Sequence, residues 1–146
     1  MAIPESFQER SFRFAVNILA FYRTTLATDL PRHLAYQMLR AGTSIAANLE
    51  EAKCAYSRRD LAAKQSIALR EARECCCWLR LVKVDQPHTE TMVDPLLTEG
   101  EEIIAMLTVS VRRLRTTPVN QPGSSNFLLL YFLLLTSYFL LLTSNF

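Results

Sequence analysis

Hydrophobic residues recur every three or four positions over the first 115 residues of the chain, which is the spacing of amphipathic helices. The first helix is predicted over about residues 4–27, and the segment Asp29-Leu30-Pro31 ends it. Its expected buried stripe joins three phenylalanines spaced by seven to three further apolar positions: Phe7, Phe14, Phe21, Ile18, Tyr22 and Leu26.

A second helix is predicted over about residues 31–54, with Pro31 well placed as its first residue. Its apolar positions alternate steps of four and three, which is typical of the seam of a bundle helix. The expected seam consists of Leu34, Met38, Ala41, Ile45, Asn48 and Ala52.

A third helix is predicted to begin after Ser57, which with Asp60 forms a variant of the capping box, and to end near Val84. Its expected core stripe consists of Leu61, Ala68, Ala72, Cys75, Leu79 and Val82. Residues 85–88 close this helix, and Thr89 or Thr91 is expected to cap a fourth helix. The expected buried side of the fourth helix contains Met92, Leu96, Ile103, Leu107, Ser110 and Leu114.

The pattern predicts an all-α protein, an antiparallel four-helix bundle over residues 1–115, because four amphipathic helices with short connections bury their stripes against one another. Residues 116–126 have the composition of a linker. An apolar, low-complexity tail follows at 127–146, where the sequence YFLLLTS occurs at 131–137 and again at 138–144.

Three interpretations of the tail stay open. It is a low-complexity extension without a dedicated function, a membrane anchor, or an apolar segment that packs on the protein's own oligomer. Residues 127–144 are uncharged and just long enough to span a bilayer, but no cations flank them to orient a span.

The chain of 146 residues carries a net charge of +2, too small to indicate a nucleic-acid binder by bulk charge alone. Three of its four cysteines are the consecutive Cys75, Cys76 and Cys77, which cannot pair with one another and cannot all face one metal from a helix. We therefore expect reduced, mostly packed thiols and no metal or cofactor. The N-terminus lacks the pattern of a signal peptide, so a cytoplasmic protein is expected, or a membrane-associated one if the tail inserts.

The predicted third helix gathers its cations within an arc of about 140°, broadly opposite its apolar stripe. Such an arc indicates a surface for nucleic-acid phosphates, because guanidinium groups grip two phosphate oxygens at once. The alternative is an ordinary solvated helix face that Glu99, Glu101 and Glu102 of the fourth helix partly neutralise. The candidate nucleic-acid-binding residues are Arg58, Arg59, Arg70, Arg73, Arg80 and Lys83. A second basic group, Arg112, Arg113 and Arg115, complements the dipole at the C-terminus of the fourth helix.

Polar residues that lie beside the apolar seams are expected to form a partly buried hydrogen-bonded set that fixes helix register: Asn48, Lys64, Glu71 and Glu74. Trp78 lies next to this set and is expected in the core or at a subunit contact. Neither histidine sits where a carboxylate-bridged metal pair needs one, and the isolated glycines form no phosphate-binding loop. We expect no enzymatic activity.

One group of motifs closely resembles the four-helix bundle protein family, also called 23S rRNA intervening-sequence proteins. The resemblance covers about residues 7–115 and is carried by RAGTSIAANLEEA at 40–52, SRRD at 57–60, Lys64, SIALREA at 66–72 and WLRL at 78–81. The chain also looks like the accessory protein of diversity-generating retroelements.

The resemblance implies a small bacterial protein that forms a homopentamer, a positively charged barrel that works with RNA or DNA and a reverse transcriptase. Two hypotheses follow. In the first, the protein is a non-catalytic, oligomeric accessory factor that binds nucleic acid through the cations of the third helix. In the second, it is a structural or protein-interaction scaffold with no nucleic-acid role.

Overall fold

A computed structural model describes residues 6–116, and this part of the chain is all-α. Four long helices and one short 3₁₀ turn follow one another, α1 (Phe7–Thr25), α2 (Arg32–Ala52), α3 (Arg58–Asp85), η1 (Pro87–Thr89) and α4 (Glu90–Thr116). No strand occurs among these residues, so the predicted all-α class is confirmed. The predicted linker and repeat tail lie outside the described residues from 117 onward.

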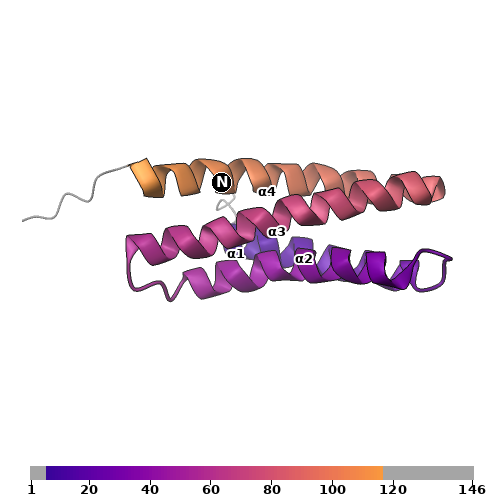
Figure 1. Cartoon of the computed structure of the whole chain (residues 1–146), viewed down its shortest axis with the longest axis horizontal. Helices are drawn as coiled ribbons and strands as arrows, with labels where there is room; N and C mark the ends of the chain where they lie inside the picture. The colour runs from indigo at the N-terminus through magenta and orange to yellow at the C-terminus, as the bar shows by residue number, and fades with distance from the viewer. Residues whose placement is uncertain (1–5, 117–146) are drawn as a thin grey trace, which may run out of the picture.

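The four helices lie side by side along one axis and form the predicted four-helix bundle (Figure 1). Successive helices pack on each other along most of their length, whereas α1 touches α4 much more sparsely. The connection from α2 to α3 and the last turn of α4 lie at one end of the bundle, and the turn from α1 to α2 lies at the other (Figure 1). No helix of the described segment is both long and apolar enough to cross a membrane.

The helix starts follow local capping chemistry, in part differently from the expectation. Ser6 and Glu9 form a full capping box that starts α1, which differs from the predicted start near residue 4. Ser57 caps α3 by accepting a hydrogen bond from the Asp60 amide at 3.0 Å, but the Asp60 carboxylate gives no reciprocal bond and its buried Oδ2 has no partner among the described residues. Pro31 is the N-cap of α2 rather than its first residue.

The prediction that Thr89 or Thr91 caps the fourth helix is wrong, because Thr91 lies inside α4 and Thr89 lies in η1. The chain makes the 3₁₀ turn η1 there and passes directly into α4 at Glu90. The Thr89 hydroxyl donates to the Gln86 carbonyl at 2.7 Å, so it closes the turn and does not accept from the helix.

The core contains most of the predicted stripe residues, and the two predicted positions that are exposed lie near helix ends. Leu26, the C-cap of α1, and Met92, in the first turn of α4, are 47 % and 44 % exposed. Seven further predicted positions are only partly buried: Phe7, Tyr22, Leu34, Asn48, Leu61, Ser110 and Leu114. The buried predicted positions are Phe14, Ile18, Phe21, Met38, Ala41, Ile45, Ala52, Ala68, Ala72, Cys75, Leu79, Val82, Leu96, Ile103 and Leu107.

Two glycines lie where a helix backbone closely approaches a side chain of a neighbouring helix. A Cβ at Gly42 of α2 would lie 2.8 Å from the Ile18 side chain of α1. A Cβ at Gly100 of α4 would lie 2.6 Å from the Cys76 sulfur of α3. At both positions the absence of a side chain lets two helices pack closely together. This explains why glycine occurs in the interior of these helices, where it normally lowers helix stability.

Candidate nucleic-acid interface

The six candidate cations of α3 do not share one environment. Arg58, in the first turn, points toward the end of α4 and donates from Nε to the Leu114 carbonyl at 3.0 Å and from Nη2 to the Arg113 carbonyl at 2.7 Å. These carbonyls belong to the last turn of α4 and have no intrahelical partner of their own. Arg58 therefore caps α4 and joins the two helices, which takes its guanidinium away from a phosphate ligand.

Lys83, in the last turn of α3, also serves the bundle. Its Nζ lies 2.7 Å from the Asp94 carboxylate and 2.7 Å from the Glu90 carboxylate, both at the start of α4. These two hydrogen bonds raise the pKa of Lys83 and hold its charge in an ion-pair network. Arg58 and Lys83 thus fasten the two ends of α3 to α4.

The other four cations form what we call the arginine row: Arg59, Arg70, Arg73 and Arg80. All four side chains are exposed, and none makes a hydrogen bond or ion pair with another described residue. At 100° per residue they fall within about 80° of one another around α3, a narrower arc than the six together. From the first to the last they extend along about 32 Å of the helix.

The end of α4 contributes a cation to the same side of the molecule. Arg115 donates from Nη2 to the Ser66 hydroxyl at 3.0 Å, and Ser66 lies within the arc of the arginine row. From the sequence, Arg115 is expected only to complement the dipole of the fourth helix. The signal that places it here is the antiparallel pairing of α3 and α4, which brings the last turn of α4 to the first turns of α3.

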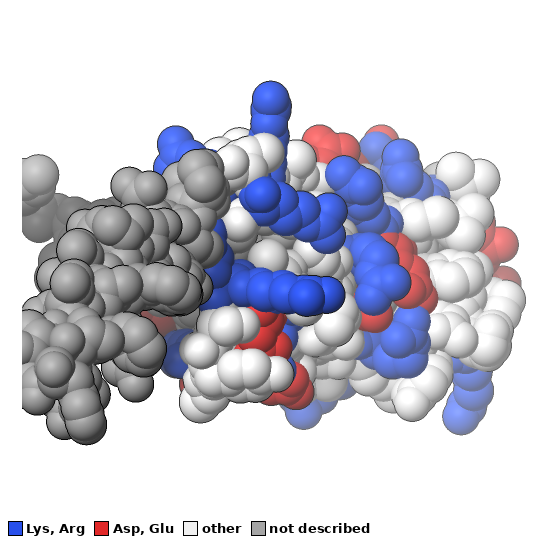
Figure 2. All heavy atoms as spheres, turned by 60° about the vertical axis from the view of Figure 1, so that its left-hand side comes forward, with Lys and Arg blue, Asp and Glu red and all other residues white. Residues whose placement is uncertain are grey.

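Acidic groups of α4 do not neutralise the arginine row in the way the alternative interpretation required. Arg10 of α1 holds Glu99 through two hydrogen bonds, from Nε at 2.6 Å and from Nη2 at 3.0 Å, and it also binds Glu102. Two of the three carboxylates expected to face α3 therefore face α1. Lys and Arg side chains spread over the face seen in Figure 2, with acidic side chains between some of them.

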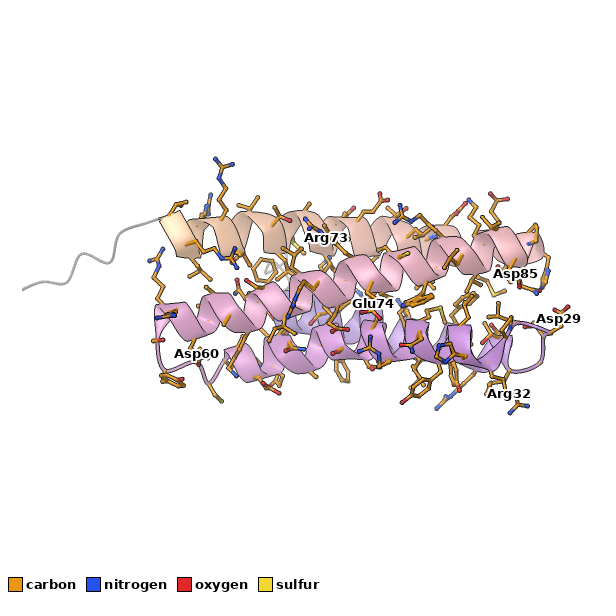
Figure 3. The ribbon with its side chains drawn as sticks, viewed as in Figure 1. Asp29, Arg32, Asp60, Arg73, Glu74 and Asp85 are labelled. Carbon is orange, nitrogen blue, oxygen red and sulfur yellow. The ribbon has the colours of Figure 1, made fainter. Side chains whose placement is uncertain are left out.

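The acidic flank of α3 faces α2 instead. Arg40 of α2 pairs with Glu71 at 3.5 Å and also with Glu74, which accepts a further hydrogen bond from the Trp78 indole at 3.2 Å. Arg40 and Trp78 together lower the pKa of Glu74. Glu74 lies at mid-length of the bundle, whereas Asp60 and Asp85 lie at opposite ends of α3 (Figure 3). Acids and arginines of this helix thus occupy different sides.

The expected polar set does not form one hydrogen-bonded group among the described residues. Asn48 donates to the Ser44 carbonyl of its own helix at 2.8 Å, and Lys64 pairs with Glu51 at 3.2 Å. Glu71 and Glu74 share Arg40, a residue that the sequence reading did not assign. The predicted set does not form because Asn48 bonds one turn away within α2 and Lys64 pairs with Glu51 across the α2–α3 connection. Neither of them bonds to the two glutamates of α3.

The cysteines are free thiols in the structure. Cys75 and Cys76 are buried, and burial raises the pKa of both, that of Cys76 to about 11, so neither is a reactive thiolate at neutral pH. Cys54 and Cys77 are exposed. Within residues 6–116 no group of histidine, cysteine and acidic side chains is arranged to hold a metal ion.

A pH-dependent contribution to stability is expected from the contact between Arg10 and Glu99. The Arg10 guanidinium lowers the pKa of Glu99 below its ordinary value of 4.5. A carboxyl group whose pKa is lower in the folded than in the unfolded state stabilises the fold at pH values above its unfolded-state pKa. This stabilisation is lost as the pH falls through its folded-state pKa. Arg10→Met should therefore lower the urea midpoint near pH 7, and the difference from the unmodified chain should shrink at about pH 3. Arg23→Met, an exposed change on the same helix, is the control, and an equal difference at both pH values would contradict the prediction.

The comparisons with known proteins agree with this fold. The profile of the 23S rRNA-intervening sequence protein family matches residues 6–109, which include α1, α2, α3 and most of α4. The chain belongs to this family. The arginine row lies within the matched region, whereas Arg115 and the repeat tail lie beyond it.

One solved structure is similar to this member of the 23S rRNA-intervening sequence family. It is a protein of unknown function from the S23 ribosomal protein family of Bacteroides thetaiotaomicron, 33 % identical, with a TM-score of 0.69. The match covers 73 % of this chain and 99 % of that one. No protein with a curated description matches. The comparisons thus show the family of this chain and agree with its fold.

Proposed function

We propose that this protein is a non-catalytic accessory factor that binds nucleic-acid phosphates through the arginine row. One observation carries the proposal: four exposed arginines lie on one side of α3 and none is engaged by another described residue. Cations held for structure are paired in this bundle, as Arg10, Arg40, Arg58 and Lys83 are. Arg23, Arg32 and Arg112 are exposed without a partner among the described residues too, but they are scattered over three helices. The row gathers four such cations on one side of one helix, and an anionic partner outside the chain is the simplest explanation.

The dimensions of the row fit a polynucleotide better than a small anion. About 32 Å of helix corresponds to roughly nine steps of a nucleic-acid strand at about 3.4 Å per step. Phosphate contacts of this kind carry no sequence information, so we expect affinity with little sequence preference. The family's name refers to 23S rRNA, which makes RNA the first ligand to test.

Self-association is part of the proposal. A homo-oligomer, a pentamer in the form suggested by the resemblance to the retroelement accessory protein, repeats the row around an axis and multiplies the phosphate contacts. This matters because the chain has a net charge of only +2 and one copy offers few free cations. A reverse transcriptase or another protein partner belongs to the same proposal.

A salt titration of RNA binding tests the proposal. Affinity of the full chain for a labelled single-stranded RNA should fall linearly on a log–log plot as salt rises. Arg70→Glu with Arg73→Glu should reduce the affinity at low salt by about tenfold or more and flatten the slope by about 1.4, because two contacts at about 0.7 each are lost. Fluorescence anisotropy measures both quantities.

The matched control is Arg23→Glu with Arg32→Glu, which changes the net charge equally. These exposed arginines lie on α1 and α2, and Arg32 is at the end of the bundle away from the end of α4 (Figure 3). An equal loss in both double variants would show a general charge effect and reject the row as the site. No binding at low salt would reject nucleic-acid binding and leave the scaffold hypothesis. Sedimentation of the same samples gives the subunit number.

A further inference from the structure

The outer surface between α1 and α2 carries an apolar groove with a volume of about 600 Å³. On one side it is lined by Phe12, Val16 and Leu19 of α1, and on the other by small side chains of α2, Ala46 and Ala47. Phe12 is 66 % exposed and Val16 is 48 % exposed. Apolar side chains gathered in this way on a surface are typical of a site that another apolar segment covers.

The spacing of the lining residues indicates the shape of what the groove accepts. The lining residues are three, four or seven positions apart along both helices, from Gln8 to Leu19 in α1 and from Thr43 to Glu50 in α2. This spacing is typical of helix faces against which a third helix packs. The lining part of α1 is about 16 Å long. The groove therefore fits about three turns of a helix with an apolar stripe.

The chain contains one segment with matching chemistry. Residues 127–146 carry no charge, and the repeat YFLLLTS returns after seven residues, which is the period of helices that pack against helices. The second copy of the repeat contains Tyr138, Leu141 and Leu142 at the positions that Tyr131, Leu134 and Leu135 occupy in the first. Neighbouring members of this set are three, four or seven positions apart. This is the same set of steps as in the groove.

The place where α4 ends favours docking within one chain. Arg58 at the start of α3 touches Arg113 and Leu114, so α4 ends at the end of the bundle where α2 passes into α3. The groove is lined at one extremity by Gln8 in the first turn of α1 and Glu50 in the last turn of α2. The last turn of α2 lies at that same end of the bundle (Figure 1). Residues 117–126 extend at most about 33 Å, and neighbouring helix axes are about 10 Å apart, so the segment reaches the groove.

We propose that the apolar groove between α1 and α2 is the docking site of the chain's own C-terminal segment, residues 127–146. Docking buries Phe12 and Val16 together with the leucines of the repeat. It leaves the arginine row free, because the row is on α3 and the groove is on α1 and α2. The proposal is independent of nucleic-acid binding.

Chymotrypsin tests the docking in the full chain, because it cleaves after the aromatic residues and leucines of the repeat. Mass spectrometry follows cleavage within residues 127–146 over time. Ala47→Glu places a carboxylate on the exposed floor of the groove and should raise the cleavage rate by about tenfold or more. Ala63→Glu, at an exposed position of α3, is the matched control and should leave the rate unchanged.

Phe12→Ala provides a second variant, which removes one wall of the groove without touching the core and should raise the rate by a smaller factor. Equal cleavage rates in the unmodified chain and in all three variants would overturn the proposal. So would protection that increases with protein concentration, which assigns the groove to a second copy. Protection that appears only with anionic phospholipid vesicles assigns the segment to a membrane and also overturns it.

Discussion

Replacing Phe14 by alanine is expected to lower the free energy of unfolding by about 3–5 kcal/mol. The Phe14 side chain is 1 % exposed and packs within the central cluster of the bundle, close to Gly100 of α4. Because α1 touches α4 only sparsely, few other side chains compensate for the lost ring. Urea denaturation followed by far-ultraviolet circular dichroism, which reports helix content, measures the change in the free energy of unfolding.

Phe12 offers a matched control two residues away on the same helix. Phe12→Ala removes the same ring from a side chain outside the core, 66 % exposed among the described residues. Even with the C-terminal segment docked over it, the free energy of unfolding should fall by much less than in Phe14→Ala. A similar loss in both variants would mean that α1 does not turn the face with Phe14 toward the core, and the described packing would be wrong.

The sequence predicts the fold well because the hydrophobic period is a local property. Phe14, Ile18 and Phe21 share one side of a helix at any rotation, so their burial follows from spacing alone. Helix ends escape this reasoning. Leu26 and Met92 continue the same period, but Leu26 lies just beyond the end of α1 and Met92 lies in the first turn of α4 beside an open hollow along α1. The 3₁₀ turn η1 likewise depends on how α3 and α4 meet.

The candidate interface is predicted only in part, since the partners of a charged side chain come from other helices. The sequence places six cations on one side of α3, but it does not show that Arg58 reaches the last carbonyls of α4 or that Lys83 pairs with Asp94. Arg40 is missed for the same reason, because its two glutamates lie on α3. Periodicity sorts residues onto faces, whereas helix pairing decides which charges stay free.

A comparison of the two buried glycines tests how tightly the helices are packed. Gly42→Ala should lower the free energy of unfolding by about 1–3 kcal/mol, even though alanine favours a helix by about 1 kcal/mol. The new methyl group would meet three atoms of Ile18 at 2.8–3.1 Å, and Ile18 is fully buried and branched at Cβ, so it has no free rotamer to move into.

Gly100→Ala should cost less, because the nearest obstacle is the single sulfur atom of Cys76 at 2.6 Å and the Phe14 ring is already at contact distance. Replacing Cys76 by alanine removes that sulfur, so the cost of Gly100→Ala should vanish in the Cys76→Ala background while the cost of Gly42→Ala stays the same. Urea denaturation of the six proteins completes the comparison. If Cys76→Ala relieves both glycine substitutions equally, the two contacts do not act locally and the assignment of each glycine to its own neighbour is wrong.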